Sequence, residues 1–324
     1  IGRIFAFAKE YRLPLSICGN GTSTSGGSLT EGMQINVSRY FTKVHKVDLK
    51  NNTATVDAGI TVEKLVVRFA ELGVRCPILS FETKARTLGG IVAENATTQA
   101  TATHGDIRSW IHGVNLVLDN GEEHHIEENL NPTGRLLEIY ENIHPLLRAQ
   151  SGNVYASQNR MLSSTSGYNV WNQSIGLKQL LDIIVGSEGT LGVITTITLR
   201  VVPLTKHTYT LCAGASSFTD AQKLADIYRQ YGCDTLSLSD SSVLKERFVP
   251  SGIQIPRFIS TLNSPYVLTG TFIARDEETV HRITHTCREK LVHHSKELEV
   301  EKGNTWPTHK DTIIKESVRQ YAEK

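Results

Sequence analysis

Regular alternation of apolar and polar residues predicts a series of short strands and helices in the first two hundred residues. Apolar positions three and four apart indicate a helix with one buried face, whereas a period of two indicates a half-buried strand. Helical spacing occurs at 1–8, 62–70 and 175–186. Strand-like alternation occurs at 13–17, 33–38, 53–58 and 192–202. Gly73 follows the second helical stretch and is typical of a helix end.

One hairpin is predicted within this part of the chain. The stretch GVNLVLDNGEEHHI, residues 113–126, carries Asn120-Gly121 at its centre, a pair that favours the tight turn between antiparallel strands. After it, residues 130–165 are polar and predict a partly helical insertion.

Beyond Pro203 the pattern changes to a regular alternation of strands and helices. Apolar strand patterns at 207–215 and 265–274 are followed by helical patterns at 219–232 and 276–292. A further strand and short helix extend to Phe248. This order favours an α+β layer with helices over an antiparallel sheet, and we place the domain boundary near residue 205.

Composition narrows the class of protein further. The chain has 324 residues and is 39% hydrophobic, and its 34 Lys and Arg residues nearly balance 33 Asp and Glu residues. Such a balance implies no nucleic-acid partner, and no apolar run approaches the roughly 20 residues that span a bilayer. The five cysteines are scattered without a CxxC motif, which argues against zinc ribbons, iron–sulfur sites and disulfide scaffolds. We therefore expect a cytoplasmic protein, with peripheral membrane attachment as the alternative.

The stretch SICGNGTSTSGGSLTEG, residues 16–32, is rich in Gly, Ser and Thr and follows a predicted strand. Successive backbone N–H groups in such a turn form a concave site for an anion, so a phosphate-binding loop is one interpretation and a flexible linker is the other. A dinucleotide-binding fingerprint would need glycine where Thr24 stands. A nucleoside-triphosphate loop would need lysine where Gly27 stands, so neither motif fits.

Two more Gly-rich stretches follow in the chain: RTLGGIVAENATTQATATHGD at 86–106 and VGSEGTLGVITTITLRVVP at 185–203. Together, and in this order, the three stretches resemble the PCMH-type flavin-binding domain of the vanillyl-alcohol oxidase superfamily. More narrowly they resemble the branch of D-lactate, glycolate and other D-2-hydroxyacid dehydrogenases. The stretch SSTSGYNV at 163–170 is similar to a motif of that branch.

The resemblance implies an α+β fold. A PCMH-type FAD-binding domain of two α/β subdomains would occupy residues 1–204, and a partial α+β (ferredoxin-like) cap domain would occupy 205–324. The chain opens at Ile1 inside a helical pattern, so we expect a fragment whose first strand is missing.

The resemblance also implies which residues bind the cofactor, FAD. Backbone N–H groups and one hydroxyl would wrap the pyrophosphate at Gly19, Asn20, Gly21, Thr22, Ser23, Gly26 and Ser25. A second set would run beside the flavin ring, with a pair close to the cofactor: Thr87, Leu88, Gly89, Gly90, Ala93 and Asn95, with His104 and Gly105. A third set would lie near the adenosine half: Glu188, Gly189, Gly192, Val193 and Ile194.

The implied function is that of an FAD-dependent oxidoreductase acting on a small D-2-hydroxy acid. Hydride would pass from the substrate to flavin N5, and the electron acceptor is left open. Alternatives are a flavin oxidase or reductase of the same fold acting on a sugar alcohol or cell-wall precursor, or a non-catalytic flavin-binding module. The first loop holds no histidine, so we expect the flavin to be non-covalent. No catalytic residue is assigned.

Two further groups of residues are candidates for a functional site, but neither is assigned to one. His281 and His285 have the spacing of two zinc ligands on a helix, but no third ligand is identifiable, so no metal is expected. Trp306, His309 and Lys310 near the end of the chain are interpreted as ordinary surface residues.

Overall fold

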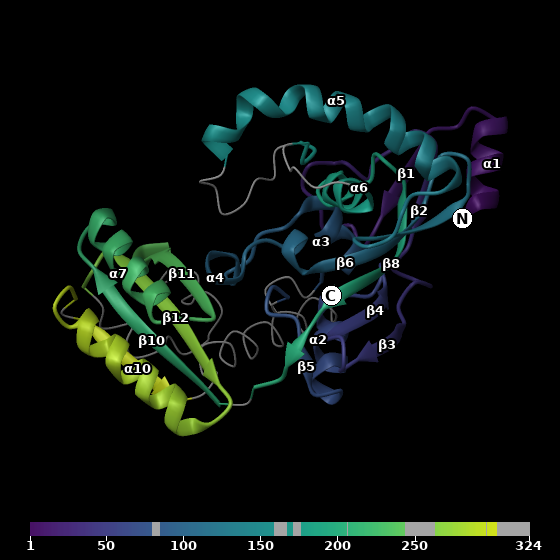
Figure 1. Ribbon diagram of the computed structural model, residues 1–324. Coiled ribbons are helices and arrows are strands. Elements are labelled where there is room, and N and C mark those ends of the chain that lie inside the picture. Colours follow the sequence, from purple (N-terminus) through teal and green to yellow (C-terminus); the bar gives the residue numbers. More distant parts are fainter. Residues whose placement is uncertain are drawn as a thin grey trace. The chain divides into compact units, whose positions relative to one another are not determined.

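The computed structural model describes residues 1–79, 85–158, 167–170, 176–205, 207–243, 263–295 and 297–302 (Figure 1). The chain divides into two compact units, each of which is described by itself. The first comprises Ile1–Thr101 and Gly105–Pro203, and the second takes in Ala102–His104 and the described residues from Leu204 onward.

A five-stranded antiparallel sheet organises the first unit. Its strands are β3 (Val44–Asp48), β4 (Thr53–Asp57), β8 (Val193–Arg200), β6 (Ile111–Val117) and β7 (Glu123–Glu127), in that spatial order. Burial alternates strictly along β8, as a strand with one covered face requires. The β6–β7 hairpin turns at Asn120-Gly121 as predicted, with φ of 81° at Gly121.

Several helices contribute to the same apolar core as this sheet, three of them with most of their buried side chains. These three are α2 (Val62–Glu71), α3 (Leu88–Glu94) and α6 (Leu177–Ile184). Their buried side chains, such as Leu65, Ile91 and Leu181, pack with sheet residues that include Val56 and Ile197. The opposite face of the sheet carries the polar residues of the alternation, which matters for the larger cavity described below.

Short elements complete the path of the chain around this core. They are α4 (Thr101–His104), the 3₁₀ helix η2 (Ile107–Trp110) and the antiparallel pair β5 (Val74–Arg75) and β9 (Val202–Pro203).

A smaller layer holds the N-terminal part of this unit. The strands β1 (Leu15–Cys18) and β2 (Met33–Asn36) pair in parallel, and the helix α1 (Gly2–Glu10) precedes them. Ile4 and Phe5 of α1 pack on a separate apolar cluster that contains Ile35 and Val193. The unit therefore has a second layer beside the five-stranded sheet, in line with the two subdomains implied by the resemblance.

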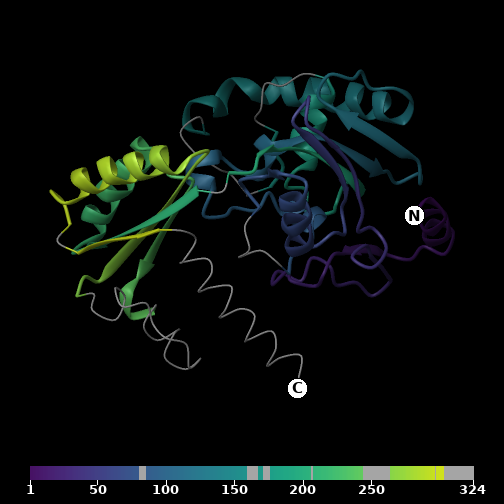
Figure 2. The same cartoon turned by 90° about the horizontal axis from the view of Figure 1, so that it is seen from below.

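The polar insertion forms one long helix, α5 (Gly134–Gln158), which contains Pro145. In Figure 1 the helix runs across the outside of the first unit, and Figure 2 shows the same arrangement turned by 90°.

The second unit has the βαββαβ pattern. The strands β10 (His207–Ala215), β11 (Thr235–Asp240), β12 (Tyr266–Ala274) and β13 (Leu298–Lys302) form an antiparallel sheet in the order β11-β12-β10-β13. The helices α7 (Phe218–Gln230) and α10 (Glu277–Leu291) pack on it around a core of its own that includes Tyr228 and Phe272. This is the ferredoxin-like arrangement expected from the sequence. The layer is completed by β13 within the described residues, whereas we expected only the start of such a layer.

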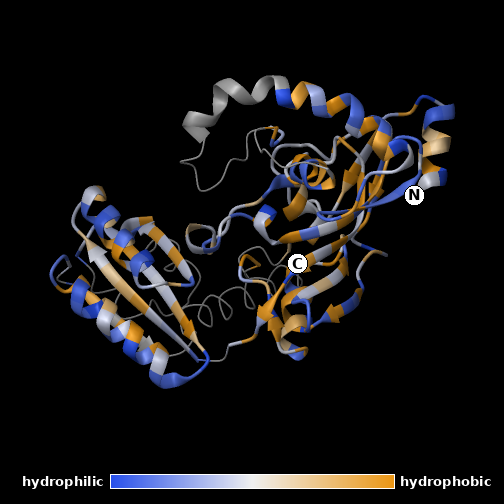
Figure 3. Cartoon of the chain, viewed as in Figure 1, coloured by the Kyte–Doolittle hydropathy of each residue, from blue (hydrophilic) through white to orange (hydrophobic). Residues whose placement is uncertain are grey.

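The helices of this unit are amphipathic. Figure 3 shows polar and apolar residues alternating along α7 and α10. In the described part of the chain, no helix combines the length and the apolar character that crossing a bilayer demands.

Candidate functional site

The loop of residues 19–28 leaves β1 and is held at its far end by side chains. Ser16 Oγ donates to the Ser28 carbonyl at 2.7 Å, and Gln34 Nε2 donates to the same oxygen at 2.7 Å. Gly21 and Gly26 have φ of 67° and 75°, values that L side chains rarely adopt. The loop is therefore a shaped turn anchored on β1 and β2, which the linker interpretation does not predict.

The second Gly-rich segment lies directly against this loop. Asn20 Nδ2 donates to the Ala85 carbonyl at 2.9 Å, and a Cβ atom at Gly19 would overlap with Thr87 Oγ1. Thr87 is the N-cap of α3, where its hydroxyl accepts from the Gly90 amide at 3.3 Å. Close approach to Thr87 thus explains why residue 19 has no side chain.

The third segment is bonded to the other end of α3. The Gly186 amide donates to the Val92 carbonyl at 3.0 Å, and the Glu188 amide donates to the Ala93 carbonyl at 2.8 Å. Glu188 has φ of 53°, a conformation that non-glycine residues seldom adopt. These bonds bring the third segment to the first two.

All three segments meet around one cavity of about 410 Å³. Ten of the predicted cofactor residues line it: Gly19, Asn20, Gly21, Thr22, Ser23, Ser25, Thr87, Gly90, Ala93 and Glu188. The predicted residues thus give the cavity a loop rich in backbone N–H groups with hydroxyls, part of a helix and the carboxylate of Glu188.

The other predicted residues do not line this cavity, and their roles stay predictions. They are Gly26, Leu88, Gly89, Asn95, His104, Gly105, Gly189, Gly192, Val193 and Ile194. Leu88 and Val193 are fully buried in apolar clusters, and the Gly89 amide donates to the Ala58 carbonyl at 2.7 Å. A Cβ atom at Gly192 would lie 2.6 Å from the Val117 carbonyl oxygen. These contacts are with the protein's own backbone and apolar side chains.

Asn95 ends α3 in a left-handed conformation with φ of 49° and is fully buried. Its Nδ2 donates to Asp106 Oδ2 at 2.7 Å, and Arg108 Nη1 lies 3.5 Å from the same carboxylate oxygen. Arg108 Nη2 in turn donates to the Val185 carbonyl at 2.8 Å. Burial lowers the pKa of the Arg108 guanidinium, against the opposing charges of Asp106 and Asp182. The network joins the second segment to the third.

His104 ends α4 and interacts within the second unit. Its Nε2 lies 2.9 Å from Asp234 Oδ1. Gly105 follows with φ of 75°.

Seven residues line the cavity that were not predicted: Ile17, Cys18, Thr24, Gly27, Ser28, Arg86 and Glu94. Arg86 and Glu94 form an ion pair. A sequence signal for Glu94 exists, because it lies four residues after Gly90 and seven after Thr87, on the same face of α3.

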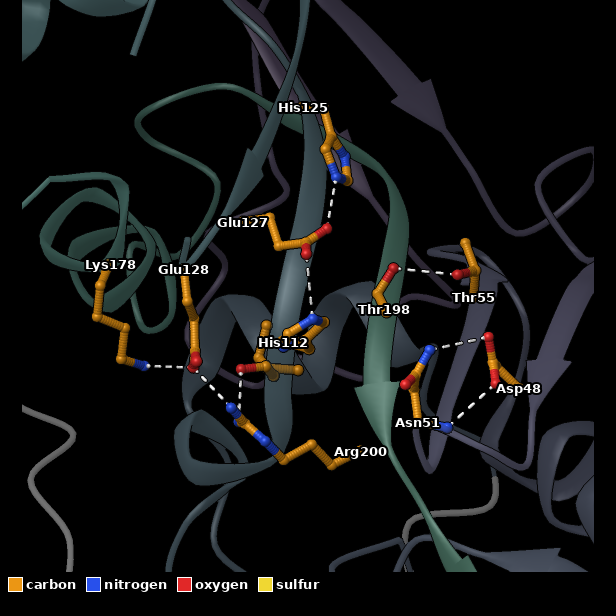
Figure 4. Close-up of polar contacts among 11 residues, drawn as sticks. Asp48, Asn51, Thr55, His112, His125, Glu127, Glu128, Lys178, Thr198 and Arg200 are labelled. Carbon is orange, nitrogen blue, oxygen red and sulfur yellow. Dashed lines mark hydrogen bonds and ion pairs between the residues drawn. The ribbon is translucent and has the colours of Figure 1, made fainter. Parts of the chain in front are cut away.

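A larger cavity, of about 1030 Å³, lies on the polar face of the five-stranded sheet and contains none of the predicted residues. Its ionic groups are paired with one another (Figure 4). Glu127 contacts His112 at 3.2 Å and His125 at 2.9 Å, while Glu128 contacts Arg200 at 2.8 Å and Lys178 at 3.3 Å.

The two histidines weighed as metal ligands lie on α10. His285 Nδ1 is 3.6 Å from Glu289 Oε1, and the His281 and His285 rings stack at 6.1 Å. Within the described ranges, no three His, Cys, Asp or Glu residues are grouped so that they could hold a metal ion. Residues 163–166 of the motif SSTSGYNV, and Trp306, His309 and Lys310, lie outside the described residues.

Comparison with known proteins connects this cavity with a cofactor. Residues 1–127, which contain the first two Gly-rich segments, match the model of the FAD binding domain family. The N-terminal part of the chain is therefore similar to an FAD-binding domain. This match agrees with the PCMH-type resemblance of the first two segments.

The similar proteins of known name are dehydrogenases and oxidases. The chain is 26% identical over 237 residues to D-2-hydroxyglutarate dehydrogenase of Pseudomonas putida, covering 70% of this chain and 24% of that protein. It is 25% identical over 229 residues to glycolate oxidase subunit GlcD of Bacillus subtilis, covering 70% and 40%. With D-lactate dehydrogenase of Archaeoglobus fulgidus the identity is 26% over 221 residues, covering 68% and 40%. The chain thus spans between about a quarter and two-fifths of these relatives.

A solved structure of alkyldihydroxyacetonephosphate synthase is similar in fold. The TM-score is 0.66 at 17% sequence identity, over 97% of this chain and 54% of that one.

Proposed function

We propose that the cavity between the three Gly-rich segments binds FAD, with the pyrophosphate against the loop of residues 19–28. The observation that carries this proposal is the meeting of all three segments at one cavity, inside a unit whose first 127 residues match an FAD-binding family. The residues present suit the group. Gly21 presents backbone without a side chain, Ser23 and Ser25 offer hydroxyls, and Arg86 offers a positive charge.

The adenosine half lies toward Glu188 and the third segment in this proposal. The flavin is held without a covalent bond, since no histidine is among the described residues that line the cavity. Cys18 is the lining thiol, and its residue is buried at the end of β1.

The proposed reaction is the oxidation of a small D-2-hydroxy acid. Relatives that are 25–26% identical to the chain over the aligned residues are named as dehydrogenases of D-2-hydroxyglutarate and D-lactate and as a glycolate oxidase subunit. When bound, the flavin supplies the acceptor for a hydride from the substrate. The residues described above bind and orient that cofactor. All five cysteines are buried and none forms a disulfide within the described residues, which supports the expectation of a reducing compartment.

The experiment has two arms. In the first, the purified chain is saturated with FAD or FMN, washed and precipitated with acid, and the released flavin is identified by mass. We expect FAD in the supernatant; release of FMN alone, or colour retained in the pellet, would contradict the proposal.

In the second arm the FAD-loaded protein is mixed without oxygen with D-lactate, D-2-hydroxyglutarate or glycolate, and flavin absorbance is followed. L-lactate is the stereochemical control. Bleaching by a D-2-hydroxy acid supports the enzyme. Stable absorbance with all of them would favour a flavin-binding module instead.

A further inference from the structure

Three ionic side chains are found among the described residues that line the FAD cavity: Arg86, Glu94 and Glu188. A cofactor pyrophosphate would add two negative charges to this wall. Two carboxylates against one guanidinium give the wall a negative balance, which is unfavourable for such a ligand. Among the described lining residues Arg86 is the only cationic side chain, so its position is decisive for binding the pyrophosphate.

The backbone on either side of Arg86 is fixed against the loop. Ala85 accepts the hydrogen bond from Asn20, and Thr87 lies against Gly19. The Arg86 carbonyl itself accepts from the Val62 amide at 2.9 Å. These contacts hold the Arg86 Cα atom beside the turn that the pyrophosphate would occupy, so the side chain reaches the loop without a change in backbone.

Arg86 is paired with Glu94 in the structure. The Arg86 side chain is 25% exposed and that of Glu94 is 52% exposed, so the pair is reached by water. Burial lowers the pKa of the Arg86 guanidinium, although arginine stays protonated in proteins. An ion pair with a half-exposed carboxylate contributes little, because solvent screens it. A phosphate offers the guanidinium a stronger, two-point partner.

We propose that Arg86 binds the pyrophosphate directly and that Glu94 is its partner only while the cavity holds no cofactor. This inference rests on the proposed function. On FAD binding the guanidinium exchanges the Glu94 carboxylate for phosphate oxygens, and Glu94 turns to solvent. Glu94 thus competes with the cofactor and sets its affinity.

The test measures the FAD dissociation constant of the full chain by quenching of flavin fluorescence. Arg86→Gln should weaken FAD binding about tenfold or more, the size expected for a lost charge-assisted hydrogen bond. Glu94→Gln should instead tighten binding about threefold, because a competing negative charge is removed. Opposite signs separate this proposal from a pair that only braces α3, for which both variants would weaken binding.

The control pair lies on α2. Arg68 and Glu71 form an exposed ion pair of 2.7 Å and do not line the cavity. Arg68→Gln and Glu71→Gln should each leave FAD affinity within about twofold of the starting protein. Competition with ADP adds a probe that carries the pyrophosphate without the flavin, and Arg86→Gln should weaken ADP as it weakens FAD.

Arg86→Lys keeps the positive charge but lacks the planar guanidinium. Its FAD affinity should lie between those of the unaltered chain and Arg86→Gln, and it serves as a second variant in case Arg86→Gln fails to fold. FAD affinity unchanged in Arg86→Gln, or weakened equally in Arg86→Gln and Glu94→Gln, would overturn the proposal. If the unaltered chain failed to bind FAD, the proposed function itself would be contradicted.

Discussion

Gly19 and Gly21 lie two residues apart in the loop after β1, yet a side chain at each would meet a different obstacle. At Gly19 a Cβ atom would overlap with Thr87 Oγ1, the cap of α3. At Gly21 there is open space, but φ is 67°. The first glycine permits two segments to touch, and the second permits the left-handed turn of the loop that lines the cavity.

Gly21→Val should therefore weaken FAD binding at least tenfold while the protein still folds. The left-handed conformation costs a branched residue about 1–2 kcal/mol, and the loop would relax away from it. Gly73 is the matched control, because its φ is 73°, it also faces open space and it lies outside the cavity. Titration with FAD and a thermal melt of both variants distinguish the effects. Equal FAD affinity in the two variants would show that the loop is not the binding element.

Asn95→Asp should destabilise the fold by about 3 kcal/mol at neutral pH, because it places a second carboxylate beside buried Asp106. Like charge raises the pKa of the introduced carboxyl above its unfolded value, so the folded state binds the extra proton. The loss is therefore full at neutral pH and shrinks as pH falls. Asn52→Asp is the control, since Asn52 has φ of 54° but is exposed. Urea unfolding at several pH values measures both, and equal losses would contradict the prediction.

At the scale of elements, Glu128 follows β7 and joins α6 to β8 through Lys178 and Arg200. Burial raises the pKa of the Glu128 carboxyl, but the hydrogen bond from Arg200 and the charge of Lys178 outweigh it, so the pKa lies below its ordinary value. A carboxyl with a lowered folded pKa contributes stability above its unfolded pKa, and this contribution disappears as pH falls through the folded value.

Glu128→Gln should accordingly lower the free energy of unfolding by about 1 kcal/mol at pH 7, a charged hydrogen bond discounted for partial exposure. The difference from the unaltered protein should shrink as pH falls below about 4, the unfolded pKa of a glutamate, and vanish below the lower pKa of the folded state. Glu138 pairs with Arg135 on the surface of α5, and Glu138→Gln should cost almost nothing. A constant difference across the pH range would rule out the ionic origin.

The local pattern of apolar and polar residues predicted most helices and strands, but it did not predict how the strands pair. Alternation at 53–58 and 192–202 predicted the strands that became β4 and β8. Their pairing joins Thr53 to Arg200, a separation in sequence that periodicity cannot encode. The strand β13 was not predicted because LEVEK is short and mostly charged. It forms through its pairing with β10, which the local pattern does not indicate.

The candidate site, too, was predicted only in part from the sequence. Three Gly-rich stretches indicated the loop, α3 and the third segment, and ten of their residues line the cavity. The ion pair of Arg86 with Glu94 was missed because charged residues at the ends of a helix are usually solvated. The role of Asn95 toward the cofactor stays a prediction, and the sequence did not indicate that its side chain donates to Asp106, eleven residues away. Side-chain partners of this kind depend on how the turn folds.

At the scale of the molecule, the two units have separate apolar cores. Leu65, Ile91 and Ile197 belong to one, and Leu211 and Tyr228 belong to the other. All of the described residues that line the proposed FAD cavity lie in the first unit. The residues that line the cavity and the residues that form the ferredoxin-like layer are thus separate sets.

A chain of residues 1–205 should therefore fold and bind FAD with an affinity within about threefold of that of the whole chain. Every lining residue and the complete five-stranded sheet are retained, while the removed part takes its own core with it. Residues 205–324 expressed alone should bind no FAD. Fluorescence titration of both pieces, with circular dichroism to establish that each is folded, makes the comparison. A folded 1–205 piece that binds FAD more than tenfold more weakly would show that the second unit contributes to the cofactor site.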